Sequence, residues 1–164
     1  MNAIKWTMTH IKGNISEKII QNSMAYKLRE MGVDCQQEVV MPVLAANVFV
    51  GYNRFDLFIP YTKNNKTMIL IIELKYLKQS LKKRFAGSRV HEQCIGYKSC
   101  ASRIFGKDVG VDVCVLNTWR VSGKIGQYKN ELIMIPTTQS DTIVEKNMSR
   151  ISKNLFSIGK KIRR

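Results

Sequence analysis

Apolar residues near the start of the chain recur with a helical period. Four of them follow one another at intervals of four, four and three residues: Ile20, Met24, Leu28 and Met31. Such intervals place the side chains on one side of a helix. The pattern begins at about Ile15 and stops at Gly32, and glycine commonly follows the end of a helix. We therefore expect an amphipathic helix over about 15–31, with its apolar side against the core.

Beyond Gly32 the pattern changes to alternation and short apolar runs, which are typical of strands. Five segments have this character: 35–53, 54–60, 69–76, 109–117 and 131–136. Pro42 in the first segment indicates an edge strand or a break, because proline cannot donate a hydrogen bond to a neighbouring strand. The polar stretch YTKNNKT (61–67) is a turn of the kind that joins two strands into a hairpin.

Two further helices are expected. One runs from about Val90 to Phe105, and the other occupies the last segment, about 141–164. The last segment has a basic outer face, and its apolar residues alternate at intervals of four and three: Val144, Met148, Ile151, Leu155 and Ile158. Helix, strands, helix, strands, helix in 164 residues predicts one α/β domain over 1–164, with a central mixed β-sheet flanked by α-helices.

The charge of the chain indicates which partners it binds. The chain carries 27 Lys and Arg against 12 Asp and Glu, a formal net charge of +15. This balance attracts polyanions, so nucleic acid, and DNA first, is the partner to expect, with a membrane surface second. The basic residues are densest over 75–89 and 160–164. A solvated surface is the alternative interpretation for most of the individual lysines.

Several other classes of protein are disfavoured. Residues 1–14 lack the apolar core of a secretory signal, and no stretch approaches the roughly 20 apolar residues of a membrane span. We therefore expect a soluble, intracellular protein that does not enter a membrane. The four cysteines form no CxxC pair and the chain has only two histidines, which argues against a structural zinc site.

Charged residues end the most apolar strand. Glu73 and Lys75 share one face of segment 69–76, because side chains two residues apart in a strand point the same way. A symmetric turn in YTKNNKT would pair residues whose numbers sum to 129. That register sets Asp56 opposite Glu73 and Arg54 opposite Lys75, all on one face of the hairpin.

Two carboxylates in such a position need a cation between them, and carboxylate oxygens are ligands that Mg²⁺ prefers. The arrangement suits metal-assisted hydrolysis of a phosphodiester. Asp56 and Glu73 would hold Mg²⁺, and Lys75 would orient or deprotonate the attacking water. Glu17, on the inward side of the first helix, would add a ligand or position a water.

This order of residues resembles the PD-(D/E)xK nuclease superfamily, whose members share a restriction-endonuclease-like fold. The matching residues are Glu17 on a helix, Asp56, and the Glu-x-Lys of Glu73 and Lys75. The resemblance covers roughly residues 15–117 and implies a Mg²⁺-dependent nuclease in which Mn²⁺ can substitute. The sequence departs from the motif in that a phenylalanine, not a proline, precedes Asp56.

A second motif supports the resemblance. HEQCIGYK places Gln93 and Tyr97 at the Q-x3-Y spacing of the RecB-like and lambda-exonuclease-like branch. The order of the segments is also similar to the small stand-alone proteins of the GxxJ type. The resemblance implies that Gln93 contacts the attacking water or a phosphate and that Tyr97 supports the site. Basic residues around the site are expected to track the nucleic-acid backbone: Arg54, Lys78, Lys82, Lys83, Arg84 and Arg89.

Each candidate also has a structural interpretation. Glu17, three residues after Asn14, fits a capping box at the helix start. The charges at the strand ends would be a solvated ion pair that contributes little stability. The Q-x3-Y pair would be a hydrogen-bonding residue beside a core aromatic. Three aromatic residues are candidates for base stacking or for the core: Trp6, Trp119 and Tyr128.

The functional alternatives belong to other classes. One is a catalytically silent, basic nucleic-acid-binding module of the same fold. The other is a membrane-surface or partner-binding protein that uses the basic amphipathic helix at 141–164. The sequence leaves open endonuclease or exonuclease action, DNA or RNA preference, and whether the chain forms a two-fold dimer or a ring.

Overall fold

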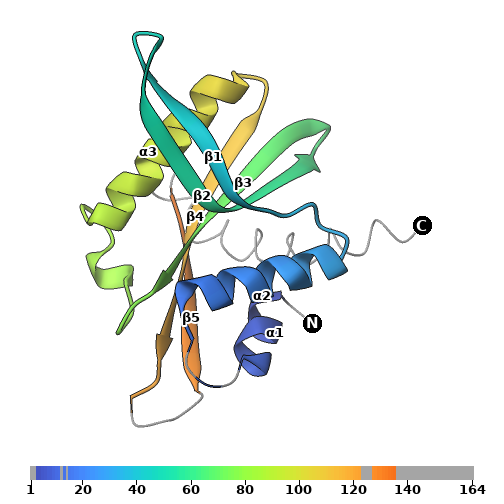
Figure 1. Cartoon of the computed structure of the whole chain (residues 1–164), viewed down its shortest axis with the longest axis vertical. Helices are drawn as coiled ribbons and strands as arrows, with labels where there is room; N and C mark the ends of the chain where they lie inside the picture. The colour runs from blue at the N-terminus through green and yellow to red at the C-terminus, as the bar shows by residue number, and fades with distance from the viewer. Residues whose placement is uncertain (1–2, 12, 14, 123–126, 136–164) are drawn as a thin grey trace.

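A computed structural model describes residues 3–11, 13, 15–122 and 127–135 of the chain. Its core is one five-stranded sheet in the order β1-β2-β3-β4-β5 (Figure 1). The helices are α1 (Ala3–His10), α2 (Glu17–Glu30) and α3 (Arg89–Phe105), with a short 3₁₀ turn η1 (Lys82–Arg84). The strands are β1 (Gln36–Ala45), β2 (Val48–Lys63), β3 (Lys66–Tyr76), β4 (Gly110–Arg120) and β5 (Tyr128–Met134).

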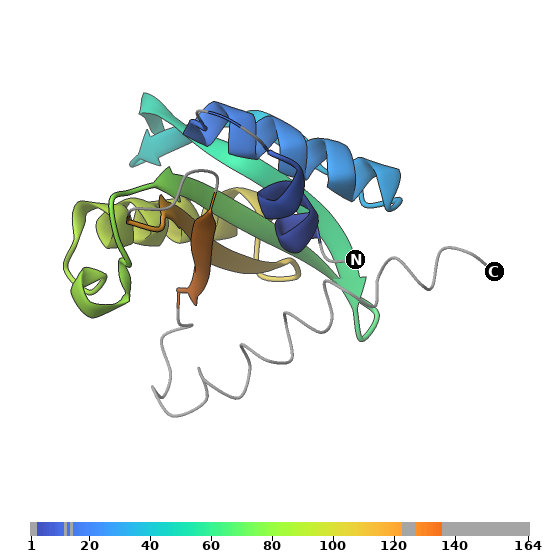
Figure 2. The same ribbon diagram turned by 90° about the horizontal axis from the view of Figure 1, so that it is seen from below.

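The sheet is mixed. Neighbouring strands are antiparallel except β3 and β4, which run parallel and are connected through η1 and α3. Helices α1 and α2 cover one face and α3 covers the other (Figure 2). The apolar residues of β3 divide between the two layers, with Leu70 and Ile72 on the α2 side and Ile69 and Ile71 on the α3 side. This arrangement confirms the predicted α/β fold with a central mixed sheet and a restriction-endonuclease-like core.

Most predicted elements are present, with shifted bounds. The first predicted helix is α2, which begins two residues later than expected and buries Ile20, Met24 and Leu28 as the pattern required. The second is α3, which begins one residue earlier than expected. Helix α1 was not predicted, and the helix expected at 141–164 lies outside the described residues. None of the helices in the described ranges has the length and apolarity needed to cross a membrane.

Two predicted strand segments, 35–53 and 54–60, form two strands with different bounds. Segment 35–53 contains β1, a turn at Ala46 and Asn47, and the start of β2, which continues through the predicted strand 54–60. Pro42 lies in β1, an edge strand of this sheet, as the proline indicated. Both turn residues have left-handed backbone conformations, and a small alanine and an asparagine occupy them.

The predicted hairpin register is confirmed, but two of its pairs are absent. Residues from Lys63–Lys66 to Leu57–Ile72 pair with numbers that sum to 129. The ladder then ends, so Asp56 does not pair with Glu73 and Arg54 does not pair with Lys75. The prediction of directly opposed pairs is wrong because the strands separate one residue too early.

The turn between β2 and β3 offers a test of the local backbone. Asn64 and Asn65 have φ values of 51° and 60°, in the left-handed region that asparagine and glycine tolerate best. Asn65→Ala is expected to lower the free energy of unfolding by about 1 kcal/mol, because a Cβ without a local polar group disfavours this region. Asn65→Gly is the matched control and should keep or raise stability. Urea denaturation measures both, and equal stabilities for the two variants would contradict the argument.

Candidate active site

The hydrogen-bond ladders of three adjacent strands are interrupted at one level of the sheet. Pairing between β1 and β2 is regular on either side of Glu38 and Asp56, but these two residues do not pair. Glu38 has a left-handed backbone with φ 56°, which no regular strand contains. The β2–β3 ladder ends just before Asp56 and Glu73. Three acidic residues from β1, β2 and β3 therefore lie at the level where the sheet opens.

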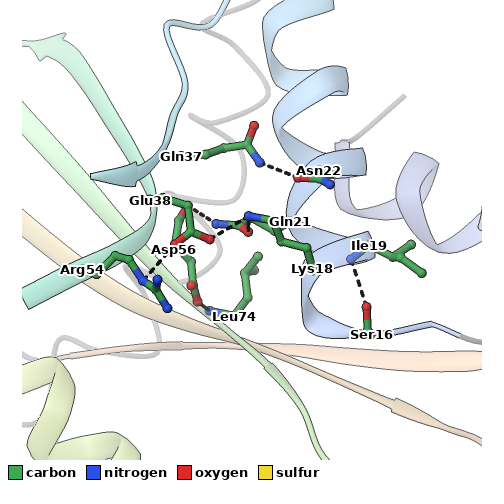
Figure 3. A network of polar contacts seen from close by, with 10 residues as sticks. All are labelled: Ser16, Lys18, Ile19, Gln21, Asn22, Gln37, Glu38, Arg54, Asp56 and Leu74. Atoms are coloured by element: carbon green, nitrogen blue, oxygen red, sulfur yellow. Dashed lines mark hydrogen bonds and ion pairs between the residues drawn. The ribbon is translucent and has the colours of Figure 1, made fainter. Parts of the chain in front are cut away.

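The side chain of Asp56 is fixed at this opening. Its Oδ2 accepts a hydrogen bond from the backbone N–H of Leu74 at 2.7 Å, in place of a backbone carbonyl (Figure 3). Gln21 of α2, which is buried, donates from Nε2 to the Asp56 carbonyl at 2.7 Å. Burial raises the pKa of Asp56, while the Leu74 amide and Lys75 oppose that shift. The carboxylate is held against β3 with one oxygen committed to the backbone.

Glu73 is the most buried charged residue of the site, with 2% of its surface exposed. Its Oε1 accepts a hydrogen bond from Lys75 Nζ at 2.5 Å. Its Oε2 is buried and forms no hydrogen bond within the described part of the chain, because the nearby Tyr97 hydroxyl, which helps to lower the pKa of Glu73, donates to the Arg54 carbonyl. Burial, followed by repulsion from Asp56, raises the pKa of Glu73 to about 7. The surface ion pair considered as the structural alternative is therefore wrong for Glu73, because that side chain lies inside the protein.

An unpartnered buried carboxylate oxygen beside a second carboxylate fits a divalent cation, which satisfies the oxygen and cancels the repulsion. Among the described residues, no group of three or more His, Cys, Asp or Glu lies close enough to hold a metal ion. Asp56 and Glu73 are accordingly the protein carboxylates that the structure offers at this point, with the remaining ligand positions open to water and substrate oxygens.

Lys75 carries a positive charge beside these carboxylates. Burial alone would lower the pKa of Lys75, but its hydrogen bond with Glu73 and the negative charges of Glu73, Glu17 and Asp56 outweigh burial and raise it. Its side chain is 19% exposed. A lysine with a raised pKa stays protonated at neutral pH, so it suits charge balance and orientation of water better than abstraction of a proton.

Glu17 is placed at the rim of the site. It is the first residue of α2, and the N-cap is Ser16, whose Oγ accepts from the Ile19 amide. The capping box with Asn14 is therefore wrong as an interpretation of this residue. Glu17 Oε1 instead accepts from the backbone N–H of Tyr76 at 3.0 Å, which ties the start of α2 to the end of β3. The charge of Glu17 affects the pKa of both Asp56 and Lys75.

The Q-x3-Y pair supports β2 from the opposite layer. Tyr97 is buried, packs edge-on against Phe55 at 4.8 Å and donates from its hydroxyl to the Arg54 carbonyl at 2.9 Å. Gln93 Nε2 donates to the Tyr97 hydroxyl at 2.5 Å. Tyr97 therefore sets the position of the backbone just before Asp56, and it lies near enough to Glu73 for each to shift the pKa of the other. Its predicted role in supporting the site stays a prediction. A contact of Gln93 with water or phosphate stays a prediction.

The three candidate stacking residues are half-buried. Trp6 stacks on His10 with a centroid distance of 4.6 Å, and Lys27 Nζ lies 5.2 Å from its ring centroid. Tyr128 donates from its hydroxyl to the Gly13 carbonyl at 2.8 Å. The contacts of Trp6 and Tyr128 are thus internal, which favours the structural role of these two residues.

The residues that form this site lie in a part of the sequence that identifies the protein family. A sequence model of the PD-(D/E)XK nuclease superfamily matches residues 2–105, more than half of the chain. The chain belongs to the PD-(D/E)XK nuclease superfamily. The matched range contains α2, β2, β3 and α3, and with them every residue of the interrupted ladders.

Two solved structures are similar to this superfamily member. A crystal structure of SSO0001 has a TM-score of 0.41 and 14% identity, over 86% of this chain and 60% of that chain. A crystal structure of a "Putative exonuclease" from Eubacterium rectale has a TM-score of 0.40 and 10% identity, over 91% of this chain and 56% of that one. The chain thus spans less than two thirds of either protein. No curated protein sequence matches it.

The basic residues expected around the candidate site are all exposed. Lys78 follows β3, three more form η1, and Arg89 begins α3. Arg54 stands apart on β2, where its Nε lies 2.9 Å from Glu38 Oε2. Most of the predicted basic residues therefore belong to one connected segment, 78–89, that leaves the sheet directly after the Glu-x-Lys motif.

A carboxylate that sequence reasoning missed anchors this segment. Glu131 of β5 accepts hydrogen bonds from Ser80 Oγ at 2.7 Å, from the Leu81 amide, and from Asn117 Nδ2 at 2.9 Å. Burial alone would raise the pKa of Glu131, but these bonds outweigh burial and lower it. Asn117 also donates to the Gln79 carbonyl at 3.0 Å. The only sequence signals were one polar residue at the end of an apolar strand and one acidic residue in the next strand.

The raised pKa of Glu73 predicts a pH-dependent stability. A carboxyl with a raised pKa binds its proton more tightly in the folded protein than in the unfolded chain. The free energy of unfolding of the wild-type protein therefore falls as the pH rises from about 4.5 to about 7. Glu73→Gln mimics the protonated form. From pH 5 to pH 8 in EDTA, the variant should gain roughly 1–3 kcal/mol relative to wild type by urea denaturation. Parallel pH profiles for the two proteins would contradict the assignment.

The anchor at Glu131 predicts a local effect on the basic segment. Glu131→Ala removes the acceptor for Ser80, Leu81 and Asn117, so amide hydrogen exchange should accelerate over residues 78–85 while the amides of β3 keep their protection. Glu30→Ala is a matched control, because Glu30 is an exposed carboxylate at the end of α2. Unchanged exchange over 78–85 would show that other contacts hold the segment.

Proposed function

We propose that this protein is a metal-dependent nuclease that hydrolyses phosphodiester bonds of DNA. Membership of the PD-(D/E)XK superfamily supports a nuclease function. The observation that carries the proposal is the buried Oε2 of Glu73, which has no hydrogen bond among the described residues and lies in a site shared with Asp56 and Lys75. An unpaired carboxylate oxygen inside the protein lowers the free energy of unfolding, and binding of a catalytic cation would explain why such a residue is present.

Asp56 and Glu73 are the residues that would hold Mg²⁺, with Mn²⁺ as a substitute. When bound, the cation supplies positive charge that lowers the pKa of a water molecule and stabilises the charge that develops on the phosphate. Glu73, with a pKa of about 7, must lose its proton for this role. Affinity for the cation should therefore increase as the pH rises through neutrality.

The chain's own groups then position the reactants. Lys75, protonated and bonded to Glu73, orients the attacking water and balances the charge of the phosphate. The oxygen of that water attacks phosphorus and its released proton passes to solvent, while the bond to the leaving oxygen breaks and the leaving oxygen takes up a proton from solvent. The Leu74 amide holds the Asp56 carboxylate in place throughout, so the site needs little rearrangement. Glu17 adds negative charge at the rim of the site. Its role as a further ligand of the cation remains a prediction.

The charge of the protein supports a nucleic acid as the substrate. The net charge of +15 and the exposed basic residues over 78–89 favour a polyanion that is bound through its backbone. Such contacts read no base sequence. The proposed enzyme is therefore expected to recognise the backbone of its substrate more than the identity of the bases.

Cleavage assays test the proposal directly. Purified protein is incubated with supercoiled, linear and single-stranded DNA and with RNA, in Mg²⁺, Mn²⁺ or EDTA. Asp56→Asn and Glu73→Gln should each lower metal-dependent cleavage by about 100-fold or more while preserving DNA binding in EDTA. Asp108→Asn is the control, because it removes the same charge from an exposed loop. Equal loss of binding and cleavage would contradict the assigned roles, and the products would distinguish nicking from end resection.

The alternative function is a catalytically silent, basic nucleic-acid-binding module of the same fold. The basic surface supports it, because a net charge of +15 by itself favours binding of a polyanion. Salt-sensitive binding of DNA, without turnover in any divalent metal, would decide for this alternative.

A further inference from the structure

An ion bridge that none of the motifs contains lies beside Asp56. Glu38 Oε1 is 2.8 Å from Lys18 Nζ, and Glu38 Oε2 is 2.9 Å from Arg54 Nε (Figure 3). The two cations come from different elements, α2 and β2, and Glu38 of β1 joins them. The three residues carry a net charge of +1, because the pKa of Glu38 is lowered, first by its hydrogen bond with Lys18, and the carboxylate stays ionised.

The bridge is connected to the candidate site through one buried side chain. Gln21 accepts from Lys18 Nζ at 2.9 Å through its Oε1 and donates to the Asp56 carbonyl at 2.7 Å through its Nε2. Arg54 lies two residues before Asp56 on β2, and Tyr97 holds the Arg54 carbonyl from the other layer. The positions of both cations are thus set by the same contacts that set the position of Asp56.

Both cations remain able to bind another anion. The side chain of Lys18 is 58% exposed and that of Arg54 is 65% exposed. The ion pair with Glu38 is formed through Arg54 Nε, and about two thirds of the Arg54 side chain stays accessible to solvent. An exposed guanidinium has planar N–H donors that match the geometry of a phosphate group.

Stability alone does not account for this arrangement. Ion pairs this exposed contribute little to folding. The left-handed backbone of Glu38 is unfavourable for a residue with a Cβ, and it interrupts the β1–β2 ladder. A strained residue that forms only weak ion pairs is better explained by the cations it positions than by the energy those pairs supply.

We propose that Lys18 and Arg54, joined by Glu38, form a clamp for a backbone phosphate of nucleic acid next to the Asp56 carboxylate. The clamp rests on the proposed function in its choice of nucleic acid as ligand. Lys18 and Arg54 contact the phosphate, and Glu38 is a positioning residue that holds them together. Arg54 is one of the basic residues that the sequence indicated, whereas no sequence pattern indicates Lys18 and Glu38, because their proximity requires α2 and β1 to be packed together.

Binding without catalysis tests the clamp. The Kd of a fluorescently labelled DNA oligonucleotide is measured in EDTA over a range of salt concentrations. Lys18→Ala and Arg54→Ala should each weaken binding roughly 3–10-fold and lower the slope of log Kd against log salt by about 1. Lys66→Ala is the matched control, an exposed lysine at the far end of the β2–β3 hairpin, and it should change Kd less than 2-fold. Thermal unfolding verifies that each variant is folded.

The role of Glu38 is tested by the sign of its effect. Electrostatics alone predicts that Glu38→Gln tightens binding, because it removes a negative charge near a polyanion. Positioning predicts the opposite, a weakening of about 2–5-fold, because Lys18 and Arg54 lose their common partner. In the Arg54→Ala background the weakening should disappear, since the residue that Glu38 positions is absent. Restoration by Glu38→Asp supports the same role.

The outcomes separate the clamp from the proposed nuclease. Lys18→Ala and Arg54→Ala behaving like Lys66→Ala, or Glu38→Gln tightening binding, would overturn the clamp whether or not the protein cleaves DNA. Binding that depends on Lys18 and Arg54, without cleavage in any metal, would support the clamp and overturn the proposed hydrolysis. No binding of DNA or RNA by the wild-type protein would overturn both.

Discussion

The hydrogen bond from the Leu74 amide to the Asp56 carboxylate is the contact on which the site depends. A buried amide must be paired, and in a regular hairpin a backbone carbonyl would pair it. Here a side chain takes that place, so β2 and β3 separate without leaving the amide unsatisfied. Glu73 occupies the level of this separation. Because a side chain replaces a backbone carbonyl as the acceptor, the β2–β3 ladder ends here and the Asp56 carboxylate is oriented, with room for the Glu73 carboxylate beside it.

Glu73 shows the cost of such a site. Its carboxyl group lies within an apolar layer that includes Phe55 and Ile71, and Lys75 neutralises one of its oxygens only. Burial next to Asp56 makes ionisation unfavourable, which is why its pKa rises to about 7. The protein therefore carries an unfavourable group at neutral pH that a cation would relieve. Stability and the proposed activity make opposite demands on this position.

Supports for the site come from every layer of the fold. Gln21 of α2 donates to the Asp56 carbonyl, Tyr97 of α3 donates to the Arg54 carbonyl two residues earlier, and Glu131 of β5 holds the basic segment. Each contact fixes backbone, not only side chains, so the geometry does not depend on mobile rotamers. Such supports explain how a weakly patterned motif is held in place within a chain of 164 residues.

The sequence by itself determined the helices α2 and α3, the hairpin register and the candidate residues Asp56, Glu73 and Lys75, because periodicity and short turns are local properties. Only the tertiary structure decided where the ladder ends, that Glu17 binds β3, and that Glu38 joins Lys18 to Arg54. These features depend on contacts between residues far apart in the chain, such as Asp56 with Leu74 and Ser80 with Glu131. No local pattern encodes such pairs, since packing of separate elements creates them.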